Sequence, residues 1–149
     1  MTIRAALDKL VTLEKGLSIT SPTALSVKDA YKYIPPQTHT LIELPVWMNA
    51  WRLNEMSWLP GNQRMSSYSV NMRLAATSAT VEQDRGADTA TSFWEALIKA
   101  LRNDVKLGGT IDQHKLRSEG PTLVVLEFAG KSYIGLDVWL DIDVIETNV

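Results

Sequence analysis

The sequence contains no cysteine, which excludes disulfides, thiolate metal sites and cysteine catalysis. It has no apolar run of about 18 residues, the length that a transmembrane helix needs. The N-terminal stretch MTIRAALDKL lacks the apolar core of a secretion signal. The net charge of −2 gives no basic footprint for nucleic acid. These absences are typical of a protein made in a reducing cytoplasm, or of one that moves between compartments.

Residues that carry catalysis are also scarce. The only histidines are His39 and His114, and neither has a carboxylate or second histidine at ligand spacing, so we expect both at the surface. The sequence contains no G-x-S-x-G, P-loop or H-E-x-x-H motif. We therefore predict a protein that is not an enzyme and that holds no metal or cofactor.

The 149 residues, 45% of them hydrophobic, predict a single domain over residues 1–149. The helices are expected from period and caps. Thr2 and Gly16 bound an amphipathic helix, and a stripe with the period of a helix predicts a second one at about 89–106, with Asp88 or Thr89 as its cap. A short helix is expected in SVKDAYKYI, residues 26–34.

Four strands are expected from alternation. Residues 38–51 form one strand, which Pro45 demotes to an edge or a bulge because proline cannot donate to the ladder. The others cover residues 63–77, 122–129 and 132–146, the last two joined at Gly130-Lys131. The predicted fold is α+β: a four-stranded, mainly antiparallel sheet of two hairpins with two to three helices packed on one face. Period and parity assign Phe93, Trp94, Leu97, Leu101, Val138 and Leu140 to the core.

The last strand presents aspartates on alternate positions. Asp137, Asp141 and Asp143 lie opposite an apolar row, and Asp137 and Asp141 are about 13 Å apart at a rise of about 3.3 Å per residue, which is too far to share an ion. A polar outer face is the simpler interpretation. The strand is also too long for the domain, so it must bend sharply or extend beyond its own sheet.

Residues 52–63 are expected to be a connection, with Pro60-Gly61 as its turn. This connection is unusually apolar for a loop, so it either folds back on the core or is buried in a partner. We predict four residues in and beside it as subunit-interface residues: Trp51, Trp58, Leu59 and Met65.

Two short sequence motifs accompany this order of helices and strands. The helix runs into D-x-x-L-G-G, and the terminal hairpin carries G-x-x-Y-x-G. Residues 64–146 thereby resemble the tail-terminator proteins of long-tailed bacteriophages and, more broadly, their small neck and tail-completion proteins. The matching residues are Asp104, Leu107, Gly108, Gly109, Gly130, Tyr133 and Gly135.

The resemblance implies a structural virion protein, made in the host cytoplasm, that forms a six-subunit ring. The ring would sit on the head-proximal end of the tail tube, contact the tail-tube protein, and stop tube polymerisation. It would also join the tail to a head-closure or connector protein. DNA would pass through its lumen without sequence-specific binding. Asp137, Asp141 and Asp143 would face that lumen, where carboxylates repel phosphate, or a solvated rim.

Two kinds of alternative remain open. One is a different virion part, either another head–tail neck or head-closure protein or a tail-tube subunit, although a tube subunit should contain less helix. The other is a small α+β binding module or enzyme, with residues 52–63 as a lid over a pocket. Catalysis would then depend on Asp141, Asp143, Glu127 or His114.

Overall fold

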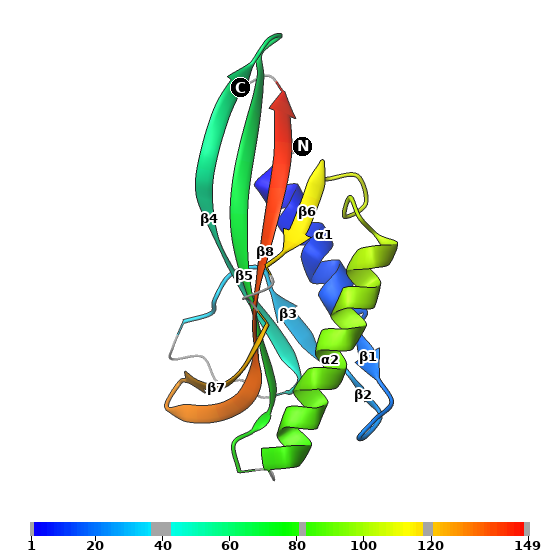
Figure 1. The fold of residues 1–149 in the computed structure, drawn as a ribbon. Coiled ribbons are helices and arrows are strands. Elements are labelled where there is room, and N and C mark those ends of the chain that lie inside the picture. The colour runs from blue at the N-terminus through cyan, green and yellow to red at the C-terminus, as the bar shows by residue number, and fades with distance from the viewer. Residues whose placement is uncertain (1, 37–42, 81–82, 118–120, 148–149) are drawn as a thin grey trace.

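A computed structural model describes residues 2–36, 43–80, 83–117 and 121–147. Two helices and eight strands follow one another along this part of the chain (Figure 1). The helices are α1 (Ile3–Lys15) and α2 (Gln83–Asn103). The strands are β1 (Ser18–Ile19), β2 (Leu25–Ser26), β3 (Asp29–Tyr31), β4 (Val46–Leu59), β5 (Gln63–Ser78), β6 (Gln113–Leu116), β7 (Thr122–Phe128) and β8 (Lys131–Thr147).

The prediction of a four-stranded sheet is wrong. The main sheet has six strands in the order β3–β4–β5–β8–β6, with β7 also paired to β8, and β1 and β2 form a separate two-stranded sheet. The main sheet is mixed because β3 runs parallel to β4, whereas the other pairs are antiparallel. Two short segments that sequence reasoning read as helix and loop supply the extra strands of this sheet, β3 and β6.

Helix α1 confirms its prediction at both ends. The Thr2 hydroxyl accepts a hydrogen bond from the Ala5 backbone N–H at 3.1 Å, and Gly16 ends the helix. Helix α2 begins at Gln83, earlier than predicted. Its first turns contain Gly86, where a Cβ atom would lie 2.6 Å from Ile134 Cδ1. The missing side chain lets α2 approach the sheet closely, which offsets the low helix propensity of glycine.

The predicted short helix at residues 26–34 is wrong. Residues 29–31 instead extend the main sheet as β3, and the preceding Lys28 backbone N–H donates to the Pro45 carbonyl at 2.8 Å. The predicted strand over residues 38–51 is displaced. Residues 37–42, which include His39, lie outside the described residues, and β4 starts directly after Pro45 because proline has no N–H for a ladder.

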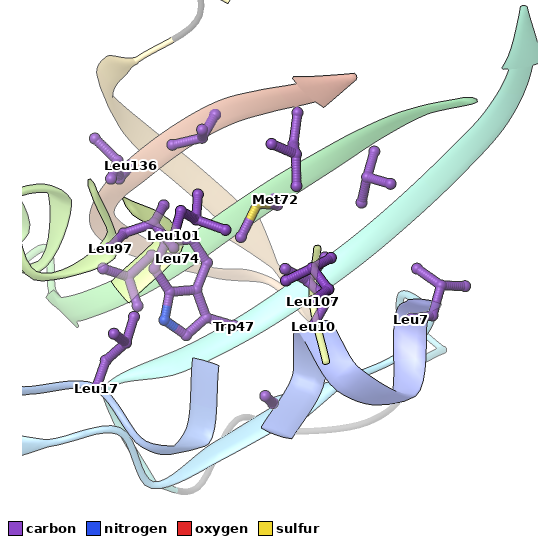
Figure 2. Packing of buried hydrophobic residues seen from close by; sticks show 14 of the residues in the cluster. Leu7, Leu10, Leu17, Trp47, Met72, Leu74, Leu97, Leu101, Leu107 and Leu136 are labelled. Carbon is purple, nitrogen blue, oxygen red and sulfur yellow. The ribbon is translucent and has the colours of Figure 1, made fainter. Parts of the chain in front are cut away.

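The core lies between the helices and one face of the main sheet, which we call the helix face. Trp47, Met72 and Leu74 project from the sheet toward Leu10 of α1 and Leu97 of α2 (Figure 2). The residues that period and parity assign to the core pack in this cluster, with Trp94 only partly buried. The opposite face carries a smaller apolar cluster where β7 folds against the curved start of β8: Val46, Met48, Ala75, Phe128 and Tyr133.

The great length of β8 is accommodated in two ways: the strand pairs on both sides, and it bends. It pairs with β5 from Tyr133 to Thr147, while its other side pairs first with β7 and then with β6. Its first half curves strongly away from the straight second half (Figure 1). The bend passes through Gly135, where a Cβ atom would collide with the carbonyl oxygen of Leu74. The long strand is therefore centred in the sheet, with strands on both sides.

Candidate interaction surface

The predicted apolar loop at residues 52–63 is wrong, because residues 52–59 continue β4. The strand ends in a three-residue turn in which Gly61 and Asn62 have positive φ, as the Pro60-Gly61 signal indicated. Every residue from Trp51 to Trp58 is exposed, and Leu59 is partly so. We call residues 51–59 of β4 the edge segment. Since it is a hydrogen-bonded strand, it cannot act as the loop lid of the enzyme hypothesis.

The pairing of β4 with β5 places the apolar side chains of the edge segment. Trp58 is 65% exposed, Leu53 47%, Met56 43% and Trp51 42%. These four share the helix face, because their partners across the ladder are Arg64, Tyr68, Ser66 and Val70, and Tyr68 and Val70 belong to the core on that face. A bulge between Leu53 and Glu55 preserves this alignment by adding one residue.

The four predicted interface residues lie at one end of the sheet but not on one face. Trp51 and Trp58 are on the helix face, where the Trp51 ring meets Tyr68 edge-on at 5.5 Å and Arg64 lies 6.0 Å from the Trp58 ring. Met65 and Leu59 alternate to the opposite face. All four are at least partly exposed. Sequence reasoning missed Leu53 and Met56, although both were visible in the same apolar stretch.

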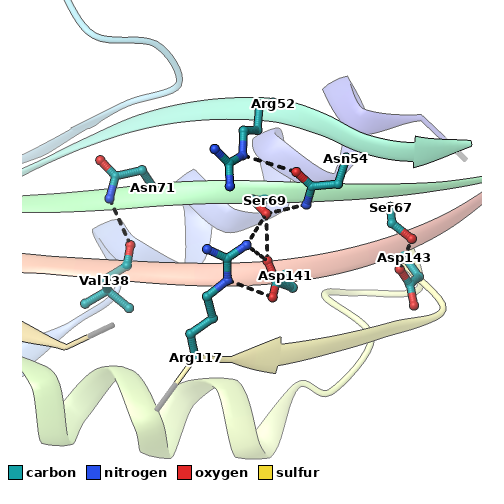
Figure 3. Close-up of polar contacts among 9 residues, drawn as sticks. All are labelled: Arg52, Asn54, Ser67, Ser69, Asn71, Arg117, Val138, Asp141 and Asp143. Carbon is teal, nitrogen blue, oxygen red and sulfur yellow. Dashed lines mark hydrogen bonds and ion pairs between the residues drawn. The ribbon is translucent and has the colours of Figure 1, made fainter. Parts of the chain in front are cut away.

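The three aspartates of β8 lie on the face opposite the helices, as parity predicted. They do not form a free acidic surface, because each is bonded to a side chain of β5. Figure 3 shows the bonds of Asp141 and Asp143. Ser67 donates to Asp143 at 2.6 Å and Ser69 donates to Asp141 at 2.7 Å. Asn71 donates to Asp137, which also lies 3.7 Å from the Arg73 Nε. We call this network the polar ladder.

Arg117 completes the middle of the polar ladder. Its guanidinium donates to both Asp141 oxygens at 2.9 Å and to the Ser69 hydroxyl at 2.7 Å (Figure 3). Partial burial raises the pKa of Asp141, but the hydrogen bonds from Arg117 and Ser69 and the charge of Arg117 outweigh it, so the pKa lies below its usual value. Sequence reasoning missed Arg117 because it follows the four-residue strand β6, which was read as loop.

Trp139 lies between the aspartates on the same face. The guanidinium carbons of Arg52 and Arg117 lie 5.3 Å and 5.2 Å from the centre of its ring, within the range of cation–π contacts. Arg52 comes from the edge segment, so this contact ties β4 to β8 across β5. On this face the side chains of β4, β5 and β8 are joined by ion pairs, hydrogen bonds and cation–π contacts.

His114, which was expected at the surface, is partly exposed. It lies in β6 opposite Ile142, on the helix face, and neither ring nitrogen has a hydrogen-bond partner in the described part of the protein. Glu127 is exposed in β7. Three of the four residues of the enzyme hypothesis, His114, Asp141 and Asp143, border one hollow beside β6, although His114 alternates to the face opposite the aspartates, and Glu127 lies apart on β7. No group of three or more potential metal ligands occurs among the described residues.

An apolar hollow lies at the other end of the sheet. It has a volume of about 350 Å³ and is lined by Ala79 and Ala87 near the start of α2, by Ile134, and by Leu123–Val125 of β7. A more polar hollow of about 400 Å³ lies beside β6 and is lined by Gln113, His114, Lys115, Asp141 and Asp143. Neither is lined by residues of the edge segment.

Within the described ranges, neither helix is long and apolar enough to cross a membrane. No protein-family model matches the chain, and no curated protein matches it.

Proposed function

We propose that this chain is a structural virion protein of long-tailed bacteriophages, a tail terminator that assembles into a ring of six copies. In this proposal the ring caps the head-proximal end of the tail tube, ends tube polymerisation and docks the head connector. DNA passes through its lumen. The motifs that resemble those proteins support the proposed family, and the exposed edge segment is the structural observation that supports the assembly.

The edge segment supports assembly for a physical reason. A long edge strand with exposed apolar side chains and unpaired backbone groups makes a monomer prone to aggregate. Proteins usually protect such edges with charged residues, with bulges or with a covering segment. Here Trp51, Leu53, Met56 and Trp58 lie together on one face of that strand. Aromatic residues and methionine are enriched at protein interfaces. A permanent partner on this strand would cover the exposed edge and remove the tendency to aggregate.

The polar ladder supports a passive role for the opposite face. In the proposal this face lines the lumen. Asp137 and Asp141 are matched by Arg73 and Arg117, Asp143 is matched by neutral donors, and Arg52 contacts Asn54 and the Trp139 ring. Among the described residues, the polar ladder therefore presents no cluster of free cations. Phosphate binding by counterion release requires such cations. DNA can then slide past the face without being held.

A second candidate is a tail-tube subunit, and the eight strands favour it more than the predicted four did. The 21-residue helix α2 counts against it, because a tube subunit should be poorer in helix. The two roles differ in assembly. A tube subunit polymerises without limit, whereas a terminator closes a ring and stops growth.

The test is the mass of the purified protein across a concentration series, followed by negative-stain imaging and by addition to purified tail tubes. We expect a closed species of about six times the 16.6 kDa chain, and tubes that stop elongating once it is added. Open filaments of the protein alone would favour the tube subunit. A chain that stays monomeric and leaves tube growth unchanged would refute both roles.

A further inference from the structure

The outer edge of β4 is open over most of its length. Strand β3 pairs only with Val46–Met48. From Asn49 to Leu59, no strand in the described part of the chain pairs with this edge, while the other side of β4 is fully paired with β5. The backbone N–H and C=O groups on the open side are therefore available to a further strand.

The same sheet ends in a second open edge on its other side. Strand β6 (Gln113–Leu116) is the last strand in that direction, and no described strand pairs beyond it. One molecule thus offers two different edges that point in opposite directions along the sheet. Such a pair of surfaces can meet head to tail between copies, which is the heterologous contact that builds rings.

The two edges lie at the same height in the sheet. The ladder row that contains Lys115 passes through Asp141 and Ser69 to Arg52, and the next row links Leu116 to Trp51 through Leu140 and Val70. The β6 edge of one copy can therefore reach the β4 edge of the next by a sideways movement with little displacement along the strands. A closed ring accommodates such a stagger when its strands tilt from the ring axis.

The strand directions also agree. Each pairing from β4 to β5, from β5 to β8 and from β8 to β6 is antiparallel, so β6 runs opposite to β4. When the next copy keeps the same orientation, its β6 arrives antiparallel to the open edge of β4. Antiparallel strands pair through straight, perpendicular hydrogen bonds, so the sheet can continue from copy to copy without a change of type.

We propose that β6 of a second copy of this chain pairs with the edge segment of β4, so that the main sheet is continuous around the assembly. This inference rests on the proposed ring and specifies which surfaces build it. The sheet then forms the inner wall. The helices cover one side of it (Figure 1), and the polar ladder lies on the other.

Charge selects the register of this contact. In the level register Arg52 and Lys115 stand opposite each other, and like charges in that position destabilise a strand pair. A shift of two residues toward the turn keeps each side chain on its own face. It brings Lys115 to the bulge beside Glu55, and Leu116 opposite Leu53. The shifted register therefore joins opposite charges on one face and apolar side chains on the other.

The apolar residues at the end of the edge segment have a counterpart near β6. The connection from α2 to β6 contains Val105, which is 55% exposed, and it runs beside β6 (Figure 1). A neighbour seated on β4 brings this connection toward the helix face, where Met56 and Trp58 are exposed. Trp58 and Trp51 still expose 65% and 42% of their surface, and a fully covered aromatic side chain buries on the order of 200 Å². The two tryptophans therefore supply part of a standard contact of about 800 Å² per partner.

The absence of cysteine makes the test direct. A variant with Glu55→Cys and Lys115→Cys carries its only thiols on the two strands, and oxidation at protein concentrations up to about 1 mM should link successive chains into a ladder of covalent oligomers. The single variants should give no ladder. Mixed with each other, they should give dimers only. A variant with Glu55→Cys and Lys99→Cys, whose second thiol lies on exposed α2, is the matched control and should give no ladder.

A second variant tests the same contact without cysteine. Leu53→Lys places a charge on the edge and should raise the dissociation constant of the assembly at least about tenfold. Val125→Lys, an exposed position on β7, should leave it unchanged. Circular dichroism and thermal unfolding of each variant report whether the subunit still folds.

Different experimental results would refute the proposed function and the inference about the edge contact. A hexamer that persists in Leu53→Lys and gives no ladder in the Glu55→Cys, Lys115→Cys variant would overturn the edge contact and leave the ring intact. Covalent dimers of the single Glu55→Cys variant would also overturn it, since they would show β4 paired with β4. Cross-linking can be measured whether or not the unmodified chain forms a ring. If the double-cysteine variant gives no series of covalent oligomers, the inference is overturned in either case.

Discussion

Glu14 should make the stability of this protein fall as the pH rises. Its side chain is fully buried at the end of α1. One carboxyl oxygen accepts a hydrogen bond from Asn49 Nδ2 at 2.7 Å, and the other has no partner among the described residues. Burial raises the pKa of Glu14 from 4.5 to about 8, and the Asn49 hydrogen bond offsets only part of this rise. Glu14 is therefore protonated in the folded protein at neutral pH.

The direction and size of the effect follow from the linkage between proton binding and folding. The pKa is higher in the folded state than in the unfolded chain, so the stabilising effect of the proton is complete below the unfolded value and is lost as the pH rises through about 8. Between pH 5 and pH 9 this loss amounts to about 4 kcal/mol, since a tenfold change in proton affinity corresponds to about 1.36 kcal/mol. Such a loss is a large share of the stability of a domain this size.

Glu14→Gln isolates the effect, because glutamine has the shape of a protonated carboxyl group and does not titrate. Urea unfolding at pH 5, 7 and 9 should give a difference between variant and wild type that grows by about 4 kcal/mol in favour of the variant. Glu95→Gln, at an exposed position of α2, controls for the change in net charge and should give a constant difference. A Glu14→Gln difference that stays constant from pH 5 to pH 9 would refute the assignment of a buried neutral carboxyl.

Two further substitutions test the sheet. Gly135→Ala should destabilise the protein by about 3 kcal/mol or more, because the added methyl group collides with the Leu74 carbonyl oxygen. Gly16→Ala is the control, because the nearest atom is 3.5 Å away, and it should change the unfolding free energy far less. Equal effects of the two substitutions would contradict the close approach at Gly135. Asp141→Ala should cost about 1 kcal/mol, because the partly exposed Arg117 and the buried Ser69 lose their acceptor. Asp141→Ala in a background that already carries Arg117→Ala should cost less, and additive costs would show that the two side chains do not interact.

Helices were more predictable from the sequence than strands, for identifiable reasons. Helix α1 has a cap at Thr2, a stop at Gly16 and an apolar stripe between them, so local signals agree. The early start of α2 depends on the contact of Gly86 with Ile134, which no local pattern shows. The edge segment was misread because it is exposed on both faces. Its side chains therefore lack the burial-driven alternation that marks a strand.

The polar ladder was half predictable. Parity alone placed Asp137, Asp141 and Asp143 on one face, but their partners come from β5 and from beyond β6, and pairings between distant segments leave no local trace. Glu14 was overlooked although a signal existed. It falls four residues after Leu10 and seven after Leu7, on the same face of α1 as those buried side chains, which is a position where a carboxylate is unexpected.

The central position of β8 has a consequence for how the protein is made. Strands β4 and β5 emerge from the ribosome as a hairpin, but the inner neighbour of β5 is β8, which is synthesised only after α2, β6 and β7. Until then the β5 side of the hairpin is open, and the β4 side is covered only where β3 pairs with Val46–Met48. Long-range pairing of this kind is slow, and unpaired strands are prone to aggregate in the interval. Translation speed and chaperone capacity should therefore limit the yield of this protein more than its final stability does.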